Sequence, residues 1–140
     1  MKILLAVDGS VYTQKMLDYL ASHVELLAGT HEYTAANVQS ALPPRARSAL
    51  GKEIVDQYYA EEGDKVLTPV CDFLAKHNVQ AARVSKIGPA GETIAKLATD
   101  GNFDLLIMGT HGHSALGNLV MGSVSTQVLA GSQVPVLLIR

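Results

Sequence analysis

Short apolar runs alternate along the chain with stretches whose apolar residues recur at helical spacing. The first run, KILLAV, ends at Asp-Gly-Ser and is typical of a strand buried on both faces of a parallel sheet. Four further runs have strand character, although YTAANV is diluted by alanines and an asparagine. The predicted strands cover residues 2–7, 33–38, 79–87, 103–109 and 134–139.

The segments between these strands have the periodicity of helices. The predicted helices cover residues 11–28, 52–77 and 90–100, and a last helix begins at Ser123. Ser10 is suited to cap the first helix, and Gly29 ends it. The segment 39–51 holds prolines and polar residues, which predict a loop. Gly63 and Pro69 predict a kink or a break in the long helix.

The alternation of strands and helices predicts an α/β domain with a parallel sheet, and composition limits what that domain can do. With 140 residues, 48% of them hydrophobic, residues 1–140 are expected to form one domain. A net charge of −2 at pH 7 gives no broad basic field, so we expect no nucleic-acid partner. No apolar run approaches the roughly 20 residues of a membrane span, so we expect no membrane partner either. The single Cys71 allows no internal disulfide, which indicates a cytoplasmic location.

The segment MGTHGHSALGNLVMGS, residues 108–123, is unusually rich in glycine. Gly109 and Gly112 permit positive φ angles and a close approach of backbone N–H groups to an anion. The helix that opens at Gly122 and Ser123 has unpaired N–H groups, which favour negative charge, and nearby hydroxyls add donors. The segment therefore has the chemistry of a phosphate-binding loop.

A second loop, Asp8-Gly9-Ser10, leaves the first strand with turn chemistry. Ligands of open α/β sheets bind beyond the carboxyl ends of the strands, where the winding direction reverses. If the first and fourth strands are neighbours, both loops face one crevice, and Asp8 is suited to accept from a ribose hydroxyl or an adenine amine. The same residues also fit a plain turn after the strand and a Ser123 that only caps the last helix. Spacing alone leaves both interpretations open.

Other chemistries fit the sequence less well. A Walker loop is absent, because the Gly51-Lys52 pair lacks the first glycine and the hydroxyl of that motif, and no G-x-G-x-x-G occurs. His111 and His113 form H-x-H without a local cysteine or acidic residue, so no dedicated metal site is expected. Asp8 lacks the acidic pair of a phosphoacceptor domain, and its loop is poor in the Ser and Thr that hold a flavin phosphate.

Four stretches together resemble the universal stress protein family, in its nucleotide-binding branch. They are ILLAVDGS, GPAGETI, DLLIMGTHGHSALGNLVMGSVSTQVL and the terminal VPVLLIR, and the resemblance spans the full chain. Its most specific part is G-x2-G-x9-G-[ST], the pattern associated with ATP binding in that family, matched by Gly109, Gly112, Gly122 and Ser123. The resemblance implies a single doubly wound domain with a five-stranded parallel sheet in the order 3-2-1-4-5 and helices on both faces.

The resemblance also implies a site and a ligand. The first two strands are expected to supply the adenosine contacts, and the glycine-rich segment the contacts to ribose and phosphates. The predicted nucleotide-binding residues are Ala6, Val7, Asp8, Val38, Met108, Gly109, Thr110, His111, Gly112, His113, Gly122, Ser123, Val124 and Ser125. The expected ligand is ATP or AMP, with Mg²⁺ accompanying ATP and bound mainly by phosphate oxygens and water.

The function that this resemblance implies is regulatory. Nucleotide occupancy is expected to tune a homodimer that forms through the last strand, between Val134 and Arg140. A slow ATP hydrolase or phosphotransferase, and an interaction module with a vestigial site, remain as alternatives. Two residues depart from the family's pattern: Asn37 stands where histidine is frequent, and His113 where arginine is often found. No role is predicted for the residues from Ser114 to Met121.

Overall fold

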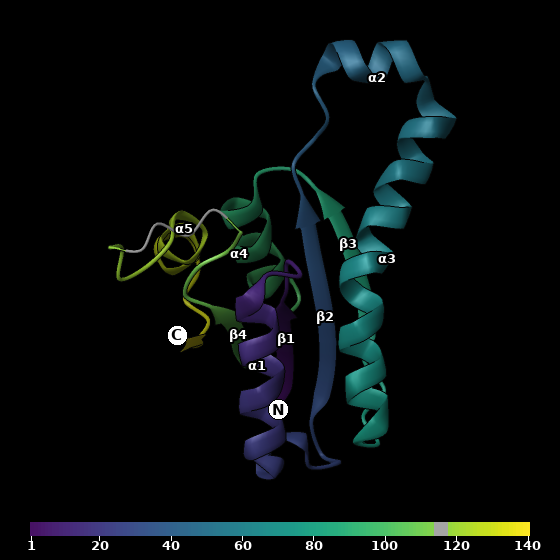
Figure 1. Ribbon diagram of the computed structural model, residues 1–140. Coiled ribbons are helices and arrows are strands. Elements are labelled where there is room, and N and C mark those ends of the chain that lie inside the picture. The colour runs from purple at the N-terminus through teal and green to yellow at the C-terminus, as the bar shows by residue number, and fades with distance from the viewer. Residues whose placement is uncertain (114–117) are drawn as a thin grey trace.

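A five-stranded parallel sheet organises the computed structural model, which describes residues 1–113 and 118–140 (Figure 1). Within these residues the strands are β1 (Lys2–Ala6), β2 (Glu32–Gln39), β3 (Ala82–Ile87), β4 (Leu105–Gly109) and β5 (Val136–Ile139). They lie in the order β3-β2-β1-β4-β5, and each neighbouring pair is parallel. The predicted order and pairing are confirmed. β3, β4 and β5 begin a few residues later than predicted, within the usual uncertainty of strand ends.

Helices cover both faces of the sheet, as predicted. They are α1 (Val11–Ser22) and α3 (Lys52–Lys76) on one face, and α4 (Ala90–Asp100) and α5 (Ser123–Gly131) on the other. Successive side chains of a strand point to opposite faces, so Ile3 and Leu5 pack with α1 and α3 while Leu4 packs with α4 and α5. All three are fully buried, and burying each contributes roughly 1.5–3 kcal/mol. β1 is thus the centre of two cores.

Two predicted boundaries are wrong. The helix expected over 11–28 ends earlier, because the backbone of His23 (φ −128°, ψ 70°) leaves the helical range, and a short 3₁₀ helix, η1 (Val24–Leu27), follows. The loop expected over 39–51 contains α2 (Pro44–Leu50). Proline is well suited to the first turn of a helix, where its missing N–H has no helical partner to lose. Here Pro44 starts a helix where composition indicated a loop.

The predicted break in the long helix does not occur, because α3 continues through Gly63 and Pro69. Leu67 and Val70 are buried on either side of the proline, and their packing against the sheet offsets the roughly 3 kcal/mol that an interior proline costs. Gly63 allows close packing on β3, since a Cβ there would lie 2.8 Å from the Ser85 hydroxyl oxygen. In the described part of the chain no helix, α3 included, is long and apolar enough to cross a membrane.

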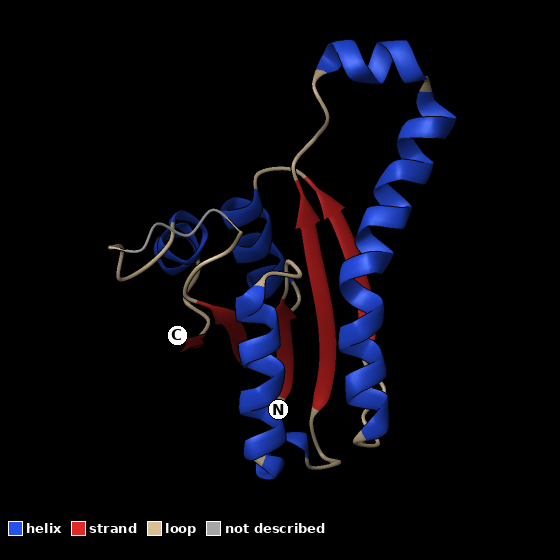
Figure 2. Ribbon diagram, viewed as in Figure 1, coloured by secondary structure: helices blue, strands red, loops and turns tan. Residues whose placement is uncertain are grey.

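The winding of the sheet reverses between β1 and β4. These two strands are neighbours and pair in parallel, so their carboxyl ends reach the same edge of the sheet. The loops that follow them lead into α1 and α5, on opposite faces (Figure 2). This reversal point is where open α/β sheets bind ligands.

Candidate functional site

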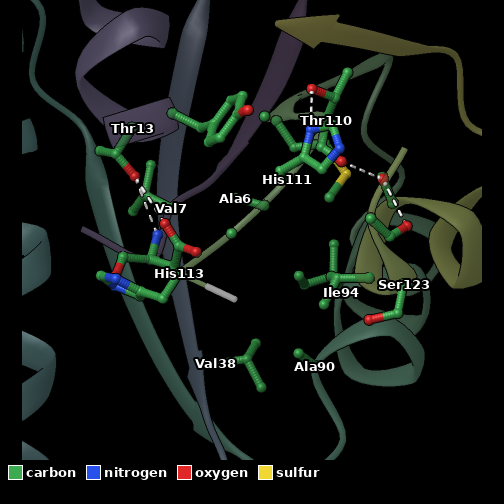
Figure 3. Close-up of a pocket in the computed structure, with 18 of the residues that line it drawn as sticks. Ala6, Val7, Thr13, Val38, Ala90, Ile94, Thr110, His111, His113 and Ser123 are labelled. Carbon is green, nitrogen blue, oxygen red and sulfur yellow. Dashed lines mark hydrogen bonds between the residues drawn. The ribbon is translucent and has the colours of Figure 1, made fainter. Parts of the chain in front are cut away.

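A cavity of about 470 Å³ lies beyond the carboxyl ends of β1 and β4. Its walls come from the ends of β1, β2 and β4 and from α1, α4 and α5 (Figure 3). The structure places around it all the residues predicted for the nucleotide site: Ala6, Val7, Asp8, Val38, Met108, Gly109, Thr110, His111, Gly112, His113, Gly122, Ser123, Val124 and Ser125. Segments far apart in the sequence therefore share one cavity, as the crevice hypothesis requires.

The turn after β1 fixes the Asp8 carboxylate. Its Oδ1 accepts hydrogen bonds from the backbone N–H of Ser10 (2.9 Å) and from the Thr13 hydroxyl (3.3 Å). The Thr13 oxygen in turn accepts from the N–H groups of Asp8 (3.2 Å) and Gly9 (3.1 Å). Gly9 has a φ of +76°, which favours glycine at this position of the turn. The other carboxylate oxygen, Oδ2, lies against Gly112 and carries no hydrogen bond from the described residues.

The glycine-rich segment folds back so that the end of β4 meets the start of α5. The Gly122 N–H donates to the Thr110 carbonyl at 2.7 Å, and the Ser125 hydroxyl donates to the same oxygen at 2.9 Å. Ser125 is 1% exposed, so its hydroxyl forms an internal hydrogen bond. Strand end and helix start are therefore joined directly.

The glycines of the motif are needed for close approach. Neither Gly109 nor Gly112 uses the positive φ that glycine permits. A Cβ on Gly109 would lie 2.6 Å from the Cβ of Tyr12, and one on Gly112 would lie 2.7 Å from Asp8 Oδ2. At Gly122 the nearest atom would be the Thr110 carbonyl oxygen, at 3.1 Å. Each glycine allows two separate segments to touch.

Both histidines of H-x-H hold the segment in place. His111 Nε2 donates to the Leu119 carbonyl at 2.7 Å, and its Nδ1 lies 2.9 Å from the Thr110 hydroxyl. His113 Nε2 donates to the main-chain carbonyl of Asp8 at 2.7 Å. Because a carbonyl oxygen only accepts, each Nε2 carries a proton. Among residues 1–113 and 118–140 no group of three His, Cys, Asp or Glu side chains is arranged to hold a metal.

The first turn of α5 presents backbone donors to the cavity. The residue that caps it is Gly122, so no side chain accepts from the first N–H groups, and Ser123 is the first helical residue. The first helical hydrogen bond runs from Thr126 N–H to the Gly122 carbonyl, which leaves the N–H groups of 123–125 without helical partners. Such a helix start favours an anion. The interpretation of Ser123 as a plain cap is not supported.

Another part of the cavity lining is apolar and comes partly from α4, which was predicted as a helix but not as part of the site. Val38, at the end of β2, faces Ala90 and Ile94 of α4 (Figure 3). The lining residues absent from the prediction are Tyr12, Thr13, Ala90, Ile94 and Leu119. The motif GPAGETI could have indicated this part of the lining. It marks the start of the helix after β3, and a helix that follows a parallel strand begins at the carboxyl edge of the sheet, where the cavity lies.

Asn37, the departure noted in the second strand, is not among the residues that line the cavity. It is 4% exposed, and its amide Nδ2 donates to the Val7 carbonyl at 2.9 Å. Its Oδ1 is buried and has no partner among the described residues. Asn37 thereby ties β2 to the residue that precedes Asp8, and it supports the turn from outside the cavity.

The fold and the cavity define a doubly wound α/β domain with a ligand site at its winding reversal. The sequence model of the universal stress protein family matches residues 1–140, and the chain belongs to that family. It is 34% identical over 139 residues to universal stress protein Slr1230 of Synechocystis. The match covers 99% of this chain, which spans only 42% of that relative's length. It is 28% identical over 150 residues to YxiE of Bacillus subtilis, covering 99% of this chain and 98% of that one.

Solved structures show the same fold. Protein MJ0577, from Methanocaldococcus jannaschii, superposes with a TM-score of 0.82 at 25% identity, over 99% of this chain and 94% of that one. A family member from Arabidopsis thaliana solved with AMP bound has a TM-score of 0.72 at 15% identity, over 99% and 90% of the two chains. Two others were solved in complex with cAMP (0.70, 19%) and, from Archaeoglobus fulgidus, with dAMP (0.67, 20%). At such identities the likeness of these last three shows the fold alone.

Proposed function

We propose that this chain binds an adenine nucleotide, AMP or ATP, in the cavity at the ends of β1 and β4. One observation carries the proposal: the separately predicted segments converge on a single cavity that is lined both by apolar side chains and by backbone donors without helical partners. The adenine complexes of proteins with the same fold support it. Residues 1–140 act as one unit in this proposal.

The two sides of the cavity suit the two ends of a nucleotide. Val38, Ala90 and Ile94 form an apolar wall for the adenine ring. The free Oδ2 of Asp8 accepts from a ribose hydroxyl or from the adenine amine. The N–H groups at the start of α5 and the Ser123 hydroxyl bind phosphate oxygens. If ATP brings Mg²⁺, the phosphate oxygens and water supply most of its ligands, with Asp8 as the one acidic side chain among the described lining residues.

Calorimetric titration of the purified protein with AMP and with ATP tests the proposal. Saturable binding of either nucleotide is expected, together with a rise in the unfolding temperature, because a ligand that binds only the folded state stabilises it. GMP is the matched control, since it has the same ribose and phosphate with a different base edge. Absence of a thermal shift and of binding heat with both adenine nucleotides contradicts the proposal. Rapid phosphate release from MgATP contradicts a purely regulatory role.

The regulatory part of the proposal is a homodimer in the cytoplasm that forms through residues 134–140. β5 is an edge strand whose residues Val136, Leu137 and Leu138 are only half-buried. An exposed strand edge is a template for pairing with another strand. In this proposal nucleotide occupancy acts on the dimer through β4, which carries the cavity on its carboxyl end and β5 along its side.

Replacing Val136 with lysine is expected to convert the dimer to a monomer, because charge on an edge strand opposes strand pairing. Light scattering after size-exclusion chromatography measures the mass. Val24→Lys is the control, since Val24 lies in η1, outside the sheet, with 67% of its surface exposed. The dimer through β5 is rejected if Val136→Lys keeps the mass of the unmodified protein while its circular dichroism is unchanged.

A further inference from the structure

Charged side chains are scarce around the cavity. Among the lining residues that the structure describes there is no lysine or arginine, and Asp8 contributes a carboxylate. The sequence has no lysine or arginine between Lys96 and Arg140, so residues 114–117 add none. The whole glycine-rich segment therefore offers phosphate groups no permanently cationic side chain.

Lysines and arginines elsewhere in the fold do not line the cavity. The Lys15 ammonium lies 4.8 Å from the centre of the ring of Tyr12, and Tyr12 rather than Lys15 lines the cavity. Arg45 and Arg47 belong to α2, which Figure 1 shows at the amino-terminal end of α3, beyond the carboxyl ends of β2 and β3. None of these three residues lines the cavity.

Most polar side chains of the segment are already engaged in its own structure. His111 bonds to Thr110 and Leu119, and His113 bonds to the Asp8 carbonyl. The Ser125 hydroxyl is tied to main-chain carbonyls. Among the described residues, the start of α5 offers the Ser123 hydroxyl and the N–H groups of its first turn as donors. A helix start with three free N–H groups matches the oxygens of one phosphate group.

We propose that the cavity selects adenosine nucleotides with one phosphate group over triphosphates, and that His113 determines this specificity. The inference rests on the proposed function. A β- and a γ-phosphate add negative charge that no cationic side chain of the cavity balances, close to the Asp8 carboxylate. His113 stands at the rim, with its Nε2 held 2.7 Å from the Asp8 carbonyl. Arginine or lysine at position 113 would place a permanent positive charge near both Asp8 and the additional phosphates. This chain has histidine there instead.

Titration calorimetry with AMP and with ATP, in EDTA near neutral pH, tests the selectivity. We expect AMP to bind about tenfold more tightly than metal-free ATP, which corresponds to one or two weak charge repulsions in a partly solvated site. Mg²⁺ neutralises part of the triphosphate charge, so adding it is expected to bring the dissociation constant for ATP closer to that for AMP.

Substitution at residue 113 tests the role of His113. His113→Arg is expected to lower the preference for AMP by about fivefold or more, because it places a fixed positive charge at the rim. His113→Gln keeps an uncharged donor for the Asp8 carbonyl. The ratio of the dissociation constants for ATP and AMP is therefore expected to stay near that of the unmodified protein, even if both affinities change. Gln80→Arg changes net charge equally, but Gln80 is exposed just before β3, at the amino end of the strands, and the ratio is expected to stay constant.

The outcomes separate this inference from the proposed function. Equal affinity for AMP and metal-free ATP overturns the selectivity and leaves nucleotide binding intact, whereas binding of neither overturns both. An equal shift of the ratio in Gln80→Arg and His113→Arg overturns the role of His113. If His113→Arg does not fold, Asp8→Asn is used, since removing the negative charge lowers the preference for AMP in the same direction. An unchanged ratio in that variant also contradicts the inference.

Discussion

Replacing Gly122 with valine is expected to weaken AMP binding by about a hundredfold while the chain still folds. The backbone of Gly122 (φ −77°, ψ 171°) is open to any residue, so the substitution brings no strain of its own. Its Cβ, however, would lie 3.1 Å from the Thr110 carbonyl and 3.3 Å from the Cα of His111. The branched side chain must push the start of α5 away from the end of β4 and enter the cavity. Calorimetry with AMP measures the loss of binding.

A second substitution, at the carboxyl end of α5, separates the loss of the site from a loss of packing. Gly122→Val is expected to lower the free energy of unfolding by roughly 1–3 kcal/mol through overpacking alone. Gly131→Val introduces a contact of similar tightness at the other end of α5, since a Cβ on Gly131 would lie 3.2 Å from the Cβ of Ala95. This control is expected to lose similar stability and keep its affinity for AMP. Unchanged AMP affinity in a folded Gly122→Val protein places the ligand elsewhere.

Replacing Gly91 with alanine is expected to destabilise the protein by roughly 1–3 kcal/mol, against the usual trend for a helix. Gly91 lies in the first turn of α4, where it packs against α5. A Cβ on Gly91 would lie 2.5 Å from the Cβ of Gln127 and would overlap its Oε1. The amide can move, but the Cβ of Gln127 moves only with α5. Urea denaturation measures the change in the free energy of unfolding.

The same substitution is expected to weaken AMP binding several-fold, because α5 carries the free N–H groups of the site. Gly29→Ala is the matched control, since a Cβ on Gly29 meets nothing within 4 Å, and its stability is expected to stay within about 0.5 kcal/mol. If Gly91→Ala is as stable as the unmodified protein or more so, helix propensity outweighs the packing of α4 on α5, and the expectation is wrong.

Both predictions depend on close contacts that define this site. The cavity is bounded by α4 and α5 on one side and by the turn of Asp8 on the other. Its anion donors are backbone groups, whose positions follow from how closely α5 approaches β4 and α4. Small shifts between these elements therefore alter the site without touching any side chain proposed to contact the nucleotide.

The sequence predicted the strands and helices from their patterns, and the family resemblance added the strand order, the helices on both faces and most of the residues around the cavity. Strands and helices are visible in the sequence because each buries one face periodically, at two residues or about 3.6 residues per repeat. The spacing of Gly109, Gly112 and Gly122 is visible because only glycine allows a neighbour where a Cβ would stand. These signals are local, so residue order is enough to read them. Nucleotide binding by these residues stays a prediction.

What the sequence could not provide depends on contacts between distant segments. The continuity of α3 through Pro69 depends on its packing against the sheet. The part of the cavity lining that was not predicted depends on where α4 begins after β3. Whether a polar group of the site is free or engaged depends on partners such as Asp8 and His113, which are 105 residues apart. The sequence thus determined the fold and the place of the site. Only the tertiary structure decided which atoms there remain free for a ligand, because hydrogen bonds are made between neighbours in space.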